Sequence, residues 1–267
     1  MFKNKFNLRK VVATETCLAV TAVVTSCKKI NGDDDDGNTG NGKVKLLETM
    51  TNSDGDSYKF AYDEQNRISK IFEYYEGSLS NTKPLIYSGN NLVELGFVPR
   101  NTISSYWTYE YTKSGNTITI TETNWLISSG SIVHTNIVTL TLNSDGLPVK
   151  EVSDSGETTF QYDRNGNIMK RLSDSGTDEM KYDDKKSPFY NCKTPKWWLQ
   201  SNYLGSVGIH HNITEYAWMD DEGYNGKTTY TYVYDSDGFP AQATVIVYDD
   251  KGVKSNEWEA MYTYIEK

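Results

Sequence analysis

Residues 162–168 read Tyr-Asp-Arg-Asn-Gly-Asn-Ile, and close variants of this stretch recur along the chain. An Asp at the first turn position can accept hydrogen bonds from the backbone that follows it. A Gly or Asn three positions later supplies the positive φ that a tight turn with a β-bulge requires. The apolar residue at the end then begins a new strand. The stretch therefore predicts the turn of a β-hairpin.

Copies of this turn run through most of the chain. The clearest begin at Tyr62, Tyr162, Tyr234 and Tyr248, and looser ones begin at Tyr87, Tyr111, Leu142 and Tyr182. From Tyr62 to Tyr182, successive copies lie 20–31 residues apart, which is room for two strands and two turns. Such a repeat indicates one continuous architecture built from hairpins.

The segments before the turns alternate between two kinds of side chain. Tyr58, Phe60 and Tyr62 alternate with Lys59 and Ala61, and the segment before residue 234 shows the same pattern. A period of two with one aromatic face is typical of half-buried strands. Residues 43–267 are therefore predicted to be all-β: a single antiparallel meander of at least ten strands, strongly curved or barrel-like, with its aromatic face inside.

One segment interrupts the repeat. The interval between Tyr182 and Tyr234 is about twice as long as the others, and it contains Trp197 and Trp198. Trp197 and Leu204 would share one face of a helix. We expect residues 188–210 to form a short helical or irregular cover on the aromatic face of the sheet. The alternative is that this insertion lines a ligand pocket.

Tryptophan side chains are the best indication of a binding site. Aromatic faces stack on sugars and anchor protein interfaces. The candidate ligand-binding aromatics are Trp197, Trp198 and Trp218, which lie in or just after the insertion.

The N-terminus has the order of an export signal. Basic residues precede a short apolar run, and residues 24–27 then read Val-Thr-Ser-Cys. This order resembles a bacterial lipobox, in which the cysteine becomes the lipidated first residue of the mature protein. A spanning helix would need about 20 apolar residues, which this run lacks. We expect residues 1–26 to be removed and Cys27 to carry the lipid; the alternative is plain secretion.

Residues 27–42 form the predicted linker between the lipid and the β domain. They contain Asp33–Asp36, followed by Gly, Asn and Thr. Such a composition stays solvated because it has little apolar surface to bury. An acidic run close behind the lipidated cysteine also resembles the export signal of Bacteroidetes surface lipoproteins, which implies an outer-membrane location with display at the cell surface.

Charge and cysteine usage restrict the partners. The formal net charge of the chain is −9, and removing residues 1–26 takes away four basic residues and one acidic residue, which leaves −12. A surface this acidic repels nucleic acid and anionic lipid headgroups, so contact with the membrane is expected through the Cys27 lipid only. The mature chain keeps Cys27 and Cys192, and with the first lipidated no internal disulfide is expected.

The sequence contains no strong signal for catalysis, a metal or a cofactor. His210 and His211 are adjacent and would point to opposite sides of a strand. Cys192 has no nearby catalytic partner other than this pair. The Asp-rich turns resemble the beginning of a calcium loop without its later ligands, and turn chemistry explains them. We therefore predict no catalytic residues, no metal site and no cofactor.

The turns are similar to the Tyr-Asp repeats of the Rhs-type family. The chain as a whole resembles Bacteroidetes lipoproteins of unknown function whose domain is described as porin-like. The shared marks are Cys27, the Tyr-Asp hairpins, the Ser-Pro-Phe-Tyr segment at 187–190 and the Trp-rich insertion that follows. The resemblance implies curling toward a barrel and brings no catalytic residues. A lipid anchor is redundant for an integral barrel, so we expect a porin-like but soluble domain.

These observations predict a lipid-anchored envelope protein that is not an enzyme. The most direct interpretation is a binding module for a glycan or a protein ligand. The alternatives are a hydrolase of extracellular polysaccharide or peptide, and a structural envelope protein. The sequence does not identify the ligand.

Overall fold

The computed structural model describes residues 43–99, 105–126, 129–200 and 208–267. The predicted signal peptide, Cys27 and the linker lie outside the described residues. Within them are seventeen strands and one short helix: β1 (Lys45–Asn52), β2 (Ser57–Tyr62), β3 (Ile68–Tyr75), β4 (Ser78–Ser88), β5 (Asn91–Leu95), β6 (Val98–Pro99), β7 (Ser105–Ser114), β8 (Thr117–Leu126), β9 (Ile132–Leu142), β10 (Pro148–Ser153), β11 (Gly156–Tyr162), β12 (Ile168–Ser173), β13 (Gly176–Tyr182), α1 (Lys196–Leu199), β14 (Ile213–Asp220), β15 (Asn225–Tyr234), β16 (Pro240–Tyr248) and β17 (Lys254–Glu266).

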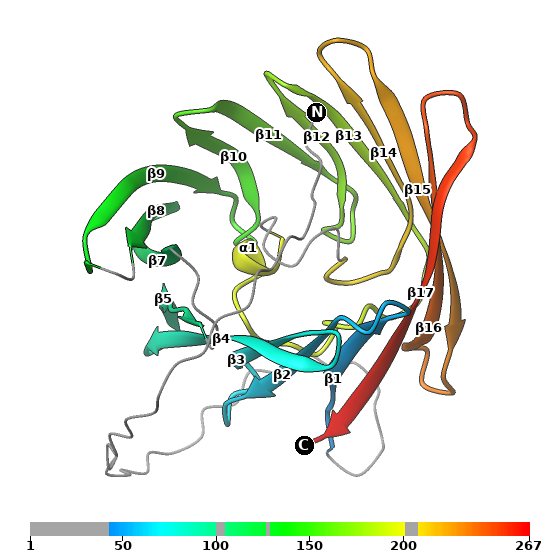
Figure 1. Ribbon diagram of the computed structural model, residues 1–267, viewed down its shortest axis with the longest axis horizontal. Coiled ribbons are helices and arrows are strands. Elements are labelled where there is room, and N and C mark those ends of the chain that lie inside the picture. Colours follow the sequence, from blue (N-terminus) through cyan, green and yellow to red (C-terminus); the bar gives the residue numbers. More distant parts are fainter. Residues whose placement is uncertain (1–42, 100–104, 127–128, 201–207) are drawn as a thin grey trace.

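The strands form one closed antiparallel barrel. Apart from the short β6, each strand pairs with its neighbours along the chain, and the last strand, β17, pairs with β1 to close the ring (Figure 1). Strand β6 pairs with β4 beside β5, and β5 pairs directly with β7, so the ring itself has sixteen strands. The all-β meander predicted from the repeat is confirmed, and the structure adds its closure, which the sequence left open.

The turn chemistry of the repeat is confirmed atom by atom. In the turn after β11, Asp163 Oδ1 accepts hydrogen bonds from the backbone N–H groups of Asn165 (2.8 Å) and Asn167 (2.9 Å). Gly166 has φ = 81°, and the strand pairing shifts by one residue at Tyr162, which marks the bulge. Five of the apolar residues that follow the turns are buried, namely Ile68, Leu92, Leu147, Ile168 and Phe239, whereas Val253, which ends the copy that begins at Tyr248, is 59% exposed.

Several tyrosines at or near the turns have a structural task that the sequence does not reveal. The Tyr162 hydroxyl donates a hydrogen bond to the backbone carbonyl of Pro148, where an earlier strand of the same sheet begins. The same bond recurs from Tyr62 to Leu47, from Tyr182 to Ile168, from Tyr87 to Ile68, from Tyr232 to Ile213 and from Tyr264 to Pro240. The hydroxyl groups therefore tie neighbouring hairpins together along one rim of the barrel.

Replacing Tyr162 by phenylalanine is expected to lower the free energy of unfolding by about 0.5–1.5 kcal/mol, the usual net value of one such hydrogen bond, or somewhat more because the Pro148 carbonyl loses its partner. Chemical denaturation of the purified protein measures this change. The matched control is Tyr224→Phe at a hairpin tip, where the side chain is 64% exposed and little change is expected. Equal effects of the two substitutions would contradict a stabilising role for the rim bonds.

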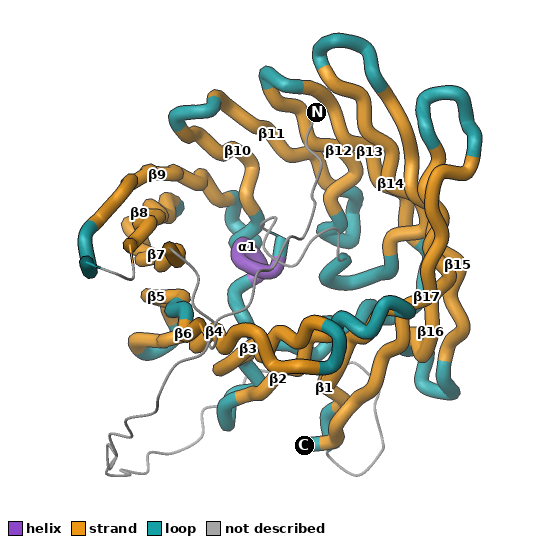
Figure 2. The backbone as a smooth tube through the Cα atoms, viewed as in Figure 1, coloured by secondary structure: helices purple, strands orange, loops and turns teal. Residues whose placement is uncertain are grey.

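The barrel interior is filled at one end by the insertion. Helix α1 lies inside the ring of strands (Figure 2), and Trp197, Trp198 and Leu199 belong to the main core cluster. The Trp198 indole N–H donates to the Tyr111 hydroxyl at 3.1 Å, and Phe189 packs edge-on against Phe60. A sixteen-stranded ring is too wide for its own side chains to fill. The described part of the cover predicted over 188–210, residues 188–200 and 208–210, is thus an internal plug that buries the apolar inner face.

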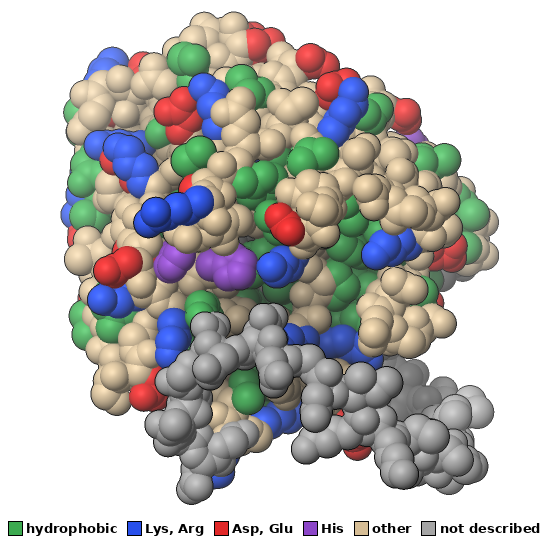
Figure 3. Space-filling model, turned by 180° about the vertical axis from the view of Figure 1, so that it is seen from behind, with side chains coloured by type: hydrophobic (Ala, Val, Ile, Leu, Met, Phe, Trp, Pro, Cys, Tyr) green, Lys and Arg blue, Asp and Glu red, His purple; other side chains and the backbone are tan. Residues whose placement is uncertain are grey.

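The outer wall carries many charged side chains, with exposed apolar residues such as Val233 and Met261 among them. Cross-strand partners point to the same side of a sheet, so residues that alternate with the inward-facing ones form the outside. They include ion pairs at Lys59–Glu48 (3.2 Å), Lys150–Glu157 (2.6 Å) and Lys181–Glu215 (2.8 Å). Seen from the opposite end, apolar side chains gather in the middle of the ring and charged ones lie around it (Figure 3).

Charged pairs on the outer wall do not fit an integral barrel, whose outside carries an apolar band for lipid. Each Lys or Arg on a lipid-facing wall would cost about 2–4 kcal/mol at the middle of the bilayer, and each Asp or Glu somewhat less. The outer wall therefore suits contact with water. Among the described residues, no helix has the length and apolar character that crossing a membrane requires.

Burial of the tyrosines makes stability sensitive to alkaline pH. Burial raises the pKa of five inner-face tyrosines to about 12, namely Tyr58, Tyr87, Tyr109, Tyr216 and Tyr230. In the unfolded chain the phenol has a pKa of about 10. A raised pKa in the folded state contributes stability that is complete below pH ~10 and is lost as the pH rises toward ~12.

We therefore expect the phenolate absorbance of the folded protein to rise in two stages, with the buried groups ionising last and together with unfolding. In urea, all tyrosines should ionise near pH ~10. A single transition near that value in the native protein would contradict the burial of these rings.

Candidate functional site

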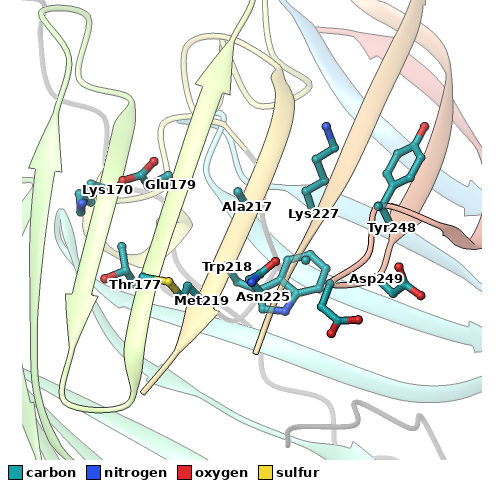
Figure 4. Close-up of a pocket in the computed structure, with 13 residues that line it drawn as sticks. Lys170, Thr177, Glu179, Ala217, Trp218, Met219, Asn225, Lys227, Tyr248 and Asp249 are labelled. Carbon is teal, nitrogen blue, oxygen red and sulfur yellow. Dashed lines mark hydrogen bonds and ion pairs between the residues drawn. The ribbon is translucent and has the colours of Figure 1, made fainter. Parts of the chain in front are cut away.

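A groove of about 490 Å³ crosses the outer wall over β12–β16. Register places five of its residues in one row across these strands: Lys170 pairs with Glu179, Glu179 with Ala217, Ala217 with Lys227, and Lys227 with Tyr248. Figure 4 shows Ala217 between the longer side chains of Glu179 and Lys227. The small residue at the centre of the row makes the floor of the groove, and its neighbours make the two walls.

Ion pairs hold the walls in place. Lys170 Nζ lies 2.8 Å from Glu179 Oε1, and this hydrogen bond lowers the pKa of the Glu179 carboxyl. On β14, the Glu215 carboxylate contacts Lys181 at 2.8 Å and Lys227 at 3.7 Å. The hydrogen bond from Lys181 is the main reason that the pKa of Glu215 is lowered. Both carboxylates therefore stay ionised and paired at neutral pH.

The far end of the groove is formed by hairpin tips and one tryptophan. Asn225 and Asp249 lie beside Trp218 there (Figure 4). The Trp218 ring stacks on Tyr216, with the ring centroids 5.8 Å apart. It also covers Gly226, where a Cβ atom would lie 2.4 Å from the indole Cζ2. Only glycine permits this close approach, so Gly226 sets the position of the ring.

The structure separates the three aromatic residues singled out from the sequence. Trp218 lines the groove, is half-buried and remains a candidate for ligand contact. Trp197 and Trp198 are 6% and 1% exposed and lie inside the barrel, where a ligand cannot stack on them in this arrangement. Their positions agree with the cover interpretation of the insertion. The expected helical partner of Trp197, Leu204, lies outside the described residues, as does Cys27.

Sequence reasoning missed most of the groove. Lys170, Glu179, Ala217, Lys227 and Tyr248 come from five strands and meet only through the register of four strand pairs. Each is an ordinary strand residue in its own segment. The only local signal was Gly226, a glycine inside a strand, which often marks a close approach.

The inner face of the barrel also carries charged side chains. Arg171 pairs with Asp178 at 2.9 Å, and Asp178 accepts a hydrogen bond from the Tyr216 hydroxyl. Burial raises the pKa of Glu151, which also lies near Glu122. These groups face inward. Trp218 pairs with Asp178 in the register and stacks on Tyr216, so its ring belongs to the same inner side, and Trp218 borders the groove only at the hairpin tips.

Cys192, His210 and His211, the reactive side chains considered from the sequence, pack against or bond to residues that form the fold. Cys192 packs against the core, burial raises the pKa of its thiol, and its Sγ contacts Thr194 Oγ1 at 3.4 Å. The His211 ring shares a hydrogen bond with Asn167 at 2.9 Å, and burial lowers the pKa of His210. In the described part of the chain, no three His, Cys, Asp or Glu side chains are grouped as metal ligands would be.

Comparison with known proteins gives similarity in structure only. No family model matches the chain, and no curated protein matches it. A porin-like protein from Bacteroides uniformis is 16% identical, with 84% of this chain and 96% of that one covered and a TM-score of 0.46. A porin-like protein from Bacteroides vulgatus is 10% identical, with 83% and 99% covered and a TM-score of 0.37.

Proposed function

We propose that this chain is a lipid-anchored protein of the outer membrane that is displayed at the cell surface and binds an extracellular glycan or protein without transforming it. The groove on the outer wall carries the proposal. It is concave, it combines aromatic, apolar and charged side chains, and it faces the water around the barrel. Such a combination is typical of ligand sites.

Two features support binding rather than transport. Helix α1 and the loops around it fill one end of the interior, where Trp198 and Leu199 are 1% and 2% exposed. The plug is also fastened to the wall, because the Ile68 backbone N–H donates to Thr194 Oγ1 at 2.8 Å and the Asn191 amide donates to the Lys45 carbonyl at 2.9 Å. Passage through the barrel would require this packing to open.

The protonation state of the groove supports binding rather than hydrolysis. A general acid needs a carboxyl group with a raised pKa, so that it still holds a proton at neutral pH. In Glu179 and Glu215, the neighbouring lysines lower the pKa instead. The two carboxylates are therefore suited to accept hydrogen bonds and to hold the walls of the groove.

Crosslinking on intact cells tests this proposal with the full-length chain. A photoreactive amino acid placed at Met219, which is 52% exposed and lines the groove, should crosslink to an extracellular glycan or protein. The same probe at Met261, which is 49% exposed on β17 away from the groove, is the matched control. Equal labelling at both positions, or turnover of a polysaccharide or peptide by the purified protein, would contradict the proposal.

A further inference from the structure

We propose that the ligand of the outer-wall groove is a short, uncharged oligosaccharide that lies along β14. This inference rests on the proposed binding function and specifies the chemical class of its ligand. It follows from the shape of the groove, from the pairing of its charges and from the character of its floor.

The groove is a trough that runs along β14. Ala217 is low, whereas its row neighbours on both sides, Glu179 and Lys227, are long. Two positions before Ala217 on the same face, the Glu215 carboxylate joins Lys181 and Lys227 and closes one end of the trough. The other end runs past Met219 toward the hairpin tips. A strand rises about 3.3 Å per residue, so the trough has room for a few sugar rings and for little more.

Charges of both signs line the trough, and those on its walls are paired with one another. Lys170 is paired with Glu179, and Lys227 is shared between Glu215 and the face of the Tyr248 ring, whose centroid is 5.5 Å away. An anionic ligand would also meet Asp249 and Asp250 at the rim, and a cationic one would meet the two lysines. An uncharged ligand avoids both conflicts and leaves the ion pairs intact.

The floor and the end of the trough suit a sugar. Ala217 and Met219 offer an apolar strip, and Trp218 lies at the end beside Asn225. A sugar ring presents apolar C–H groups on its face and hydroxyl groups on its edge. The C–H face can rest on the strip, while the wall carboxylates and ammonium groups and the Asn225 amide bond the hydroxyls.

The test is a binding screen of the purified full-length protein against immobilised oligosaccharides, some uncharged and some containing uronic or sialic acids. We expect uncharged oligosaccharides to bind, with an affinity that changes little with salt concentration because no net charge is neutralised. Ala217→Leu fills the floor and should weaken binding about tenfold or more, whereas Ala217→Ser should retain it. The matched control is Ala61→Leu, which changes an outward-facing alanine on β2 far from the groove. Position 217 lies on the outer face, so we expect these substitutions to leave the fold intact. An unchanged melting temperature of each variant checks that it is folded.

Binding restricted to acidic sugars, binding that falls steeply with salt, or equal affinity of Ala217→Leu and the parent chain would each overturn the inference. Silence across the whole panel would overturn it as well. These outcomes differ from failure of the proposed function. If the crosslink at Met219 captures a protein while the sugars fail, the groove is a binding site whose ligand is not a glycan; if the crosslink is also absent, the binding function itself fails.

Discussion

Replacing Trp198 by alanine is expected to lower the free energy of unfolding by about 3–5 kcal/mol, the range for large aromatic side chains removed from a core. Trp198 is 1% exposed and lies where α1 meets the inner wall. Its removal opens a cavity in the plug and leaves the Tyr111 hydroxyl without the indole N–H that donates to it. For a domain of this size, each kcal/mol lowers the melting temperature by roughly 2–4 °C.

The control for this experiment is Trp107→Ala. Trp107 is 36% exposed near one end of β7 and packs edge-on against His134, so its truncation should cost much less, about 1 kcal/mol. Calorimetry or chemical denaturation of both variants measures the difference. If the two variants lose the same stability, the helix is not part of the core and the barrel does not depend on its plug.

Replacing Cys27 by serine is expected to move the protein from the membrane fraction to the soluble fraction. Acyl chains contribute about 0.8 kcal/mol per buried CH₂ to membrane binding, and the polar outer wall offers no substitute for them. Metabolic labelling with a palmitate analogue should be lost at the same time. Both effects are all-or-none, because the acidic domain has no other predicted contact with lipid.

Two further cysteines provide matched controls. Cys17 precedes the predicted cleavage site, and Cys192 packs against the core. Serine at either position should leave palmitate labelling unchanged. Labelling that survives Cys27→Ser would show that the lipobox interpretation is wrong.

Replacing Asp33–Asp36 by alanine should reduce the accessibility of the protein to protease on intact cells, without lowering its abundance, if this run directs surface display.

Much of the fold could be predicted because its signals are local. The turn at Asp163 and Gly166 needs only a carboxylate that reaches the next backbone N–H groups and a residue that tolerates positive φ. The alternation of Tyr58, Phe60 and Tyr62 with polar neighbours needs only the period of a strand. Both properties are visible in a few adjacent residues, and both are confirmed.

The candidate site was only partly predictable, because its residues come from different strands and meet only in the folded barrel. Trp218 could be named because tryptophan is rare and large. The remaining walls and floor, including Ala217 and Lys227, have no distinctive local context. A shift of one residue in any of the four strand pairs would turn one strand's contribution to the other face of the sheet.

The sequence by itself determined the elements: hairpins joined by Asp- and Gly-containing turns, an inner face rich in tyrosine, charged residues on the outer face and an insertion that had to cover the apolar side. The tertiary structure alone decided three further properties. Pairing of β17 with β1 closed the sheet into a ring, closure placed α1 inside as a plug, and register assembled the groove. Propensity and turn chemistry act between neighbours in the chain, whereas closure, plugging and register depend on contacts between residues far apart in it, so that no single segment contains them.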